Sequence, residues 1–222
     1  MKIGHNRDGF SLIELLVAVA LSVIIMAAIY STYYSQQKSF IVQEQLAAMQ
    51  QNLRAAMFYM EREIRMAGCD PTRKAGAGVT TADATSLRFT EDTDGDTVLV
   101  SITYSLYTDT DGIRKLGRDT GGGTIPVADN IEVIDFVYLD GASPPNVLND
   151  PGTNNVLPAK IPDIRAVQVT VVARTGREDL AYTDTTDFYN QNDLVNPIVA
   201  AQNDHYRRKA LSTNIKCRNL GL

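Results

Sequence analysis

The sequence predicts an α+β fold in which one long N-terminal helix packs on an antiparallel β-sheet. No proline or glycine occurs between Phe10 and Ala67, so nothing in that stretch interrupts a helix. Beyond residue 68 the pattern changes to short alternating apolar runs separated by polar loops, which is typical of strands and turns. A chain of 222 residues is long enough to bury a core of this kind.

The first half of the predicted helix, residues 10–34, is apolar around its whole circumference. Within residues 15–29 only Ser22 is polar, and the stretch exceeds the about 20 residues that a helix needs to cross a bilayer. No small-residue cleavage site of the secretory type follows it. Lys2 and Arg7 precede the helix, which favours an N-terminus on the cytoplasmic side of the membrane.

The second half of the helix, residues 35–67, carries a single apolar stripe. Its members recur every three or four residues and are Val42, Leu46, Met49, Leu53, Ala56, Met60, Ile64 and Ala67. Gly68 and Pro71 then indicate that the helix ends. We expect this stripe to lie on the sheet. The alternative is a membrane anchor followed by a separate coiled-coil stalk.

Three residues at the start of the apolar run carry a resemblance to a known family. Gly9, Phe10 and Glu14 are arranged as in the type IV pilin superfamily, whose members have a short basic leader that ends in glycine. Phenylalanine and, at the fifth mature position, glutamate then follow. The resemblance implies a type IV pilin-like fold and a leader peptide at residues 1–9. It also implies a prepilin peptidase that cuts between Gly9 and Phe10 and methylates the new amine of Phe10.

Shorter motifs extend this resemblance to minor pilins of the PilW type. They are Arg65-Met66-Ala67-Gly68, the Thr-Asp-Gly-Asp loop at 93–96 and Arg218-Asn219-Leu220. The resemblance implies a minor pilin that helps to initiate, prime or cap a type IV pilus. Its partners would be other minor and major pilins and the inner-membrane assembly machinery. A minor pseudopilin of a type II secretion system, similar to the J component, has the same anatomy and is the alternative.

Glu14 places a carboxylate in an apolar helix, where an unpaired charge costs free energy. We expect the amine of Phe10 on a neighbouring subunit to neutralise it when the apolar halves bundle. Such a pair fixes axial register, as a polar residue does inside a coiled coil. The alternative is that Glu14 is an interfacial residue at the membrane surface.

The globular part, residues 68–222, is predicted to contain several strands. They are expected near 87–89, 98–104, 113–116, 131–139, 164–173 and 206–217. The polar insertions 140–162 and 175–203 are expected to form exposed surfaces. The basic cluster at 207–209 is expected to be a solvated strand end.

Candidate chemistry in this sequence is sparse. No nucleophile, metalloprotease or phosphate-binding motif occurs, so we expect a structural protein or, as a different class, a membrane-anchored periplasmic binding protein rather than an enzyme. A net charge of −5 disfavours nucleic acid as a partner. Asp92, Asp94 and Asp96 alternate as in half of a calcium loop, and calcium is the single cofactor candidate. A hairpin turn is the alternative, and Asp109 and Asp111 repeat the pattern in a second turn.

The two cysteines, Cys69 and Cys217, lie near the two ends of the globular part. We expect them to form a disulfide if that part is exported, which would contribute about 4–5 kcal/mol in the chain-entropy model. The alternative is two separate buried thiols. The expected location is the inner membrane, crossed once with the globular domain in the periplasm, and then the pilus at the cell surface.

Overall fold

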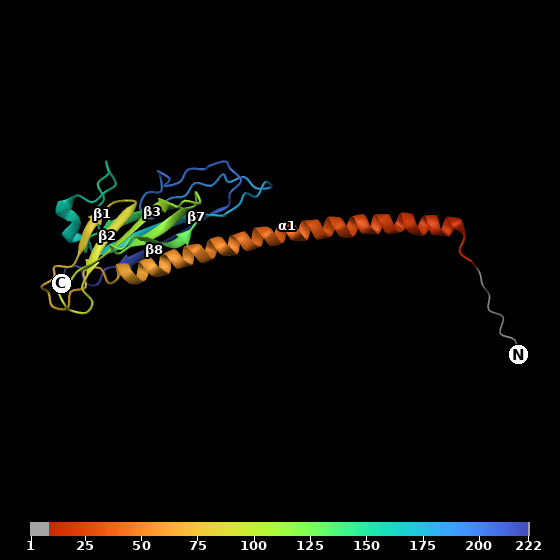
Figure 1. Ribbon diagram of the computed structural model, residues 1–222. Coiled ribbons are helices and arrows are strands. Elements are labelled where there is room, and N and C mark those ends of the chain that lie inside the picture. Colours follow the sequence, from red (N-terminus) through yellow and green to blue (C-terminus); the bar gives the residue numbers. More distant parts are fainter. Residues whose placement is uncertain (1–8, 222) are drawn as a thin grey trace. The chain divides into compact units, whose positions relative to one another are not determined.

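The computed structural model describes residues 9–221, in which one long helix precedes two β-sheets (Figure 1). The helix α1 spans Leu12–Ile64; the strands are β1 Val79–Ala82, β2 Ser86–Glu91, β3 Val100–Thr108, β4 Arg114–Asp119, β5 Thr124–Asp129, β6 Ile131–Leu139, β7 Ala166–Arg174 and β8 Arg208–Lys216; a short 3₁₀ helix, η1, spans Pro158–Asp163. The chain divides into two compact units within α1, one ending at Glu44 and the other beginning at Gln45.

The strands of the second unit form one five-stranded and one three-stranded sheet. The first has the order β1-β2-β3-β4-β5 and the second the order β6-β7-β8, and every neighbouring pair is antiparallel. The predicted α+β class, with a long N-terminal helix and antiparallel strands, is therefore confirmed. Sequence patterns did not predict the division into two sheets, because alternation reports which face of a strand is buried and not which strands pair.

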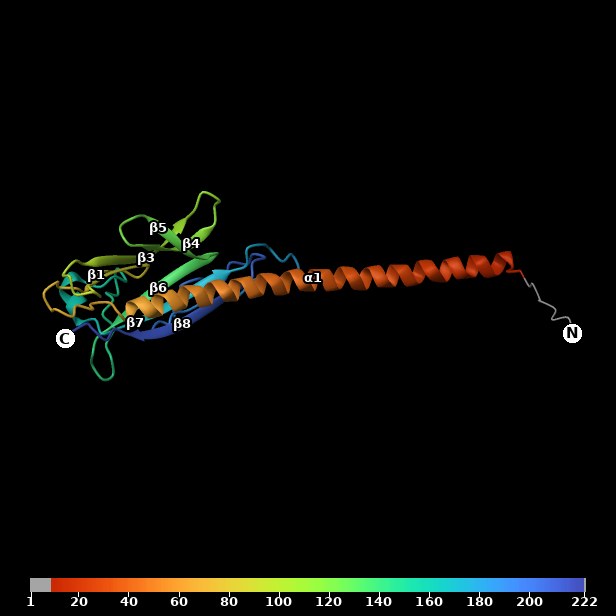
Figure 2. The ribbon, with the colours of Figure 1, turned by 60° about the horizontal axis from the view of Figure 1, so that its bottom comes forward.

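The predicted apolar stripe is the part of α1 that packs in the core. Its members Met49, Leu53, Ala56, Met60 and Ile64 are buried, and so is Met57, which the predicted stripe did not include. They join one hydrophobic cluster with side chains of both sheets, among them Phe89 and Tyr104 of the first sheet and Phe136 and Val169 of the second. Figure 1 and Figure 2 both show the end of α1 running along β7 and β8. The stripe therefore closes both sheets into a single core.

The helix ends where the sequence predicts, within three residues. After Ile64 the turn tightens, because the backbone N–H of Ala67 donates to the carbonyl of Ile64 at 3.2 Å. Gly68 then adopts a φ of +79°, a left-handed conformation that glycine takes without a Cβ clash. Its N–H donates to the carbonyl of Thr90 at 3.1 Å, which directs the chain into the first sheet.

Two of the strands were not predicted. β1 is short and rich in threonine, and β5 contains Pro126, so neither has the apolar alternation that marks a strand in sequence. Both lie at margins of the five-stranded sheet, where such sequences are tolerated. The expected strand at 131–139 is confirmed with the same bounds in β6.

The insertion at residues 175–207 covers the face of the three-stranded sheet that points away from α1. Thr170 and Val172 of β7 lie on that face and are buried, although they are outside the main core. The side-chain amide of Asn190 donates to the carboxylate of Asp135 in β6 at 3.0 Å, which ties the insertion to the sheet. The expectation of a simply exposed surface is therefore wrong for the base of this insertion.

Arg208 is buried, with a side chain that is only 1% exposed, so the expectation of a solvated strand end is wrong for this residue. Its guanidinium donates to the carboxylates of Glu132, Asp184 and Asp204. These bonds involve Nε and both terminal nitrogens of the guanidinium, so each of its three nitrogens donates to a carboxylate. The cluster joins β6, β8 and the insertion. The run of basic residues at 207–209 does not reveal these partners, because they lie elsewhere in the sequence.

The packing of α1 predicts a large difference between two methionines at its C-terminal end. Met60 is 0% exposed, whereas Met66 is 39% exposed. We expect Met60→Ala to lower the free energy of unfolding by about 2–5 kcal/mol, because it leaves a cavity, and Met66→Ala to lower it by about 0.5 kcal/mol. Urea unfolding of the full chain in detergent measures both. Equal losses for the two variants would contradict the packing described.

Candidate functional site

The predicted cleavage point lies at the first described residues of the chain. Gly9 and Phe10 precede α1, and the side chain of Phe10 is 91% exposed. A Cβ placed on Gly9 would meet no atom within 4 Å. The fold itself therefore does not require glycine at this position, and a requirement for glycine must come from something that binds the segment. The rest of the leader lies outside the described residues.

Ser11 and Glu14 form a reciprocal cap at the start of α1. The Ser11 hydroxyl accepts a hydrogen bond from the Glu14 N–H at 3.3 Å, and Glu14 Oε2 accepts one from the Ser11 N–H at 2.8 Å. Oε2 also accepts the Ser11 hydroxyl proton at 2.9 Å. This is a capping box, in which each side chain satisfies a backbone donor that the helix leaves unpaired. Ser11 is a site residue that we did not predict, although the spacing Ser-x-x-Glu signals it.

The cap engages only one of the two carboxylate oxygens of Glu14. Among residues 9–221, no hydrogen bond to Glu14 Oε1 is present. That oxygen is at the surface, so a second donor can reach it. Glu14 can therefore cap its own helix and accept a bond from another molecule at the same time.

The first unit exposes an unusually large apolar surface. Every residue of α1 up to Ile41 is exposed, and among them are the large side chains Leu12, Ile13, Leu15, Leu16, Val17, Val19, Leu21, Val23, Ile24, Ile25, Met26 and Ile29. By length and composition this helix can cross a membrane. Soluble monomers rarely expose contiguous apolar surface on this scale, so this part of α1 requires lipid or protein around it.

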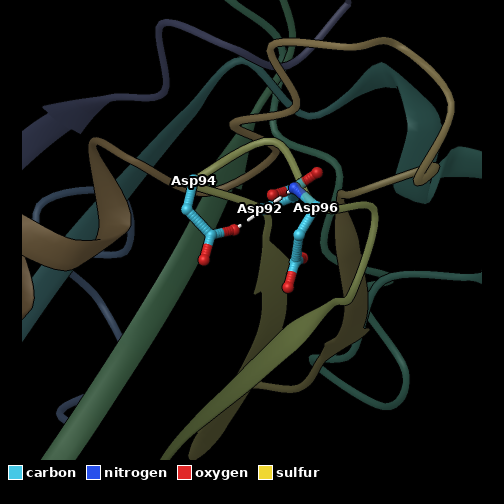
Figure 3. A group of neighbouring side chains, drawn as sticks. All are labelled: Asp92, Asp94 and Asp96. Carbon is cyan, nitrogen blue, oxygen red and sulfur yellow. Dashed lines mark hydrogen bonds between the residues drawn. The ribbon is translucent and has the colours of Figure 1, made fainter.

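The candidate calcium residues lie together in the loop after β2, as Figure 3 shows. Asp92, Asp94 and Asp96 each offer a carboxylate oxygen within 4.8 Å of the others. The buried Asp92 already accepts bonds from the N–H groups of Gly95 at 2.7 Å and Thr97 at 3.1 Å. These bonds shape the turn, whereas Asp94 and Asp96 remain exposed. The loop therefore has the geometry of the predicted turn and also gathers three carboxylates.

The second aspartate pair has a different partner. Lys115 of β4 donates to Asp109 at 2.7 Å and lies 2.9 Å from Asp111. The hydrogen bonds from Lys115 hold the pKa of both carboxyls below their usual range. An ammonium group thus occupies the position that a cation would take, in agreement with the predicted turn.

The two cysteines are free thiols in different surroundings. Cys69 is half-buried just after α1, whereas Cys217 is buried in the core just after β8. Burial raises the pKa of Cys217 to about 12, and burial together with nearby carboxylates raises the pKa of Cys69. Both thiols are therefore weak nucleophiles once the chain has folded.

The segments that carry these cysteines touch one another. The Asn219 side-chain amide donates to the carbonyls of Arg65 and Met66, at 3.4 Å each. A Cβ on Gly68 would lie 2.5 Å from Cδ2 of Leu220, so a larger residue would displace the leucine, and the φ of +79° also favours glycine here. The two short motifs at 65–68 and 218–220 thus form one contact.

The N-terminal sequence matches a known family. The family described as the prokaryotic N-terminal methylation motif covers residues 4–30 of the chain. The chain begins with a prepilin-type methylation motif. The resemblance predicted from Gly9, Phe10 and Glu14 is thereby confirmed at the motif, which implies processing by a prepilin peptidase and assembly with other pilins.

Similarity outside the motif is low. A solved type IV-like pilin from Thermus thermophilus aligns with a TM-score of 0.48 and 14% sequence identity. The alignment covers 78% of this chain and 97% of that pilin. No curated protein matches the sequence.

Calcium titration of the full chain tests the aspartate loop. A site made of Asp92, Asp94 and Asp96 predicts that the free energy of unfolding rises by about 1.4 kcal/mol when free calcium reaches ten times its dissociation constant. Asp94→Asn should abolish the rise. Asp111→Asn is the matched control and should retain it, because Lys115 occupies that pair. If calcium does not change the melting temperature, the loop is a turn that binds no calcium.

Both cysteines are free thiols in the structure, and the disulfide expected from the sequence stays a prediction: if the globular part is exported, we expect Cys69 and Cys217 to be paired in the native protein. Proteolysis without reductant should yield one joined peptide pair, and Cys217→Ser should release Cys69 for alkylation. The prediction fails if both cysteines of the wild-type protein are alkylated after denaturation alone.

Proposed function

We propose that the chain is a minor pilin, a low-copy subunit that helps to initiate, prime or cap a type IV pilus. The observation that carries this proposal is the methylation motif at residues 4–30, which includes the start of α1, together with the exposed apolar side chains on all sides of the first part of that helix. A motif that frees a new amine next to such a helix suits a subunit stored in a membrane and then transferred into a bundle of helices.

The minor role is supported by the contact between the motifs at 65–68 and 218–220. Gly68 must be glycine because of its φ of +79° and the Leu220 side chain against it. The Asn219 side-chain amide donates to the Arg65 and Met66 carbonyls in the turn that follows the helix. Gly68, Asn219 and Leu220 of these PilW-like motifs thus meet in one contact, which supports this type over a chance similarity of short sequences.

We further propose that Glu14 aligns the subunit with its neighbour. Oε2 is used by the cap, and Oε1 can accept a bond from the amine of Phe10 on the adjacent subunit. In a water-free bundle a carboxylate without a cationic partner costs several kcal/mol. Only one axial offset of the two helices brings the groups together, so the pair selects that register.

The proposed orientation follows from charge. Lys2 and Arg7 stay on the cytoplasmic side, so the globular unit lies in the periplasm before assembly and on the pilus afterwards. We propose no catalytic role for the chain. The charged side chains of Lys115 and Arg208 are held by carboxylates in ion pairs that tie parts of the fold together.

Substitution of Gly9 tests processing. We expect Gly9→Leu to block removal of the leader, because a bulky side chain cannot enter a protease site that accepts glycine. Gly9→Ala is the control with the smallest side chain and should still be processed. Neither substitution should disturb folding, since within residues 9–221 no atom beyond the neighbouring residues lies within 4 Å of a Cβ placed here. Gel mobility of the membrane-bound protein measures the outcome, and mature mobility for Gly9→Leu argues against cleavage at this bond.

Two substitutions of Glu14 separate its capping role from its charge. Glu14→Gln keeps a side chain that can close the capping box but carries no charge, whereas Glu14→Ala loses both. We expect both variants to enter the membrane and both to reduce pilus number, measured by electron microscopy in a strain that depends on this subunit. Normal piliation with Glu14→Gln would show that the cap, and not the charge pair, is what assembly needs.

A further inference from the structure

The outer edge of β8 is a long strand edge that the rest of the described chain leaves open. β8 is the last strand of its sheet and pairs with β7 alone. All nine of its residues are in regular register with β7, and it contains no proline. A regular strand of this length can hydrogen-bond a further strand on its free side.

The hydrogen-bonding pattern between β7 and β8 shows which backbone groups of β8 point away from the sheet. The Cys217 N–H donates to the Arg165 carbonyl at 2.9 Å, and the Thr175 N–H donates to the Arg207 carbonyl at 2.9 Å. Because bonding alternates along an antiparallel strand, the odd-numbered residues of β8 face β7. The backbone groups of Ala210, Ser212, Asn214 and Lys216 therefore face away from the sheet. Within residues 9–221 none of these groups has a turn or loop partner, and Ser212, Asn214 and Lys216 are exposed.

The other margins of the two sheets are protected. β5 contains Pro126 and a register shift beside it. β1 has only four residues and is also irregular in register. The free edge of β6 is covered by Asn149, whose amide donates to the Phe136 carbonyl at 3.0 Å and accepts from the Tyr138 N–H at 2.7 Å. These are the devices by which proteins block unwanted strand pairing, and β8 lacks them in its central part.

The charges on β8 indicate which kind of strand fits. Lys209 and Lys216 are exposed near its two ends, and the strand contains no acidic residue, although the whole chain has a net charge of −5. Two copies paired edge to edge through β8 would bring no carboxylate of one β8 to the lysines of the other, so charge gives self-pairing no attraction. A strand with a carboxylate at each end would instead be attracted.

We propose that the free edge of β8 is a docking site for one extended segment of a different protein, added as a fourth strand and bearing acidic residues near both of its ends. Main-chain bonds to Ala210, Ser212 and Asn214 supply the attraction, as in other cases of strand addition. The two lysines select the partner by charge. This goes beyond assembly through α1, because it concerns a contact made by the globular unit.

A peptide titration of the full chain in detergent micelles tests this assignment. The probe is a short acetylated peptide of alternating threonine and valine with one glutamate at each end. Backbone amide spectra should show slowed hydrogen exchange at Ser212 and Asn214 when it binds, with Thr213 already protected before it is added. The same peptide with terminal lysines should bind about tenfold more weakly at low salt, and added salt should reduce this difference.

Matched variants of Ser212 complete the test. Ser212→Pro removes an outward N–H that β7 does not use and should weaken binding by about tenfold or more, whereas Ser212→Ala keeps the N–H and should bind as wild type. If Ser212→Pro does not fold, the exchange pattern of the wild-type chain decides. The proposal is overturned if Ser212 and Asn214 are protected without peptide, or if the glutamate and lysine peptides bind equally.

Discussion

The apolar stripe on the second half of α1 is the interaction on which the rest of the fold depends. Neither sheet can bury its inner face alone, since each presents large side chains such as Tyr104 and Phe136 to the same helix. The stripe from Met49 to Ile64 supplies the common surface. The turn at Gly68 and the C-terminal segment around Leu220 then hold the end of the helix. One element therefore organises the core while the same helix, further toward its start, exposes a large and mainly apolar surface.

Ion pairs that are shielded from solvent position parts of the fold that the apolar stripe does not position by itself. Glu63 of α1 accepts bonds from the Tyr104 hydroxyl at 2.6 Å and from Arg118 at 2.9 Å, which joins the helix to β3 and β4. Arg208 does the same for the long insertion. Burying such groups contributes little net stability, but removing one partner leaves an uncompensated charge. These pairs therefore specify one arrangement of helix, sheets and insertion more than they strengthen it.

Much of this arrangement could be predicted from the sequence, because it depends on local periodicity. The helix, its stripe and the strands β6 and β7 follow from patterns with strong apolar repeats. The cover of the second sheet and the burial of Arg208 depend on contacts between distant segments, for which no local pattern exists. At the N-terminus, the methylation motif could be recognised from the resemblance carried by Gly9, Phe10 and Glu14. The capping role of Ser11 became clear only from its bonds to Glu14.

The central claim is that the mature protein is made by a cut at Gly9 and begins with a modified phenylalanine next to a capped, wholly exposed apolar helix. That claim concerns covalent structure, so it can be read directly from the native protein. Mass spectrometry of the N-terminal peptide of the protein isolated from its own cells is the most direct test. We expect a peptide that starts at N-methylated Phe10. A peptide that starts at Met1, or at an unmodified residue beyond Phe10, would contradict it.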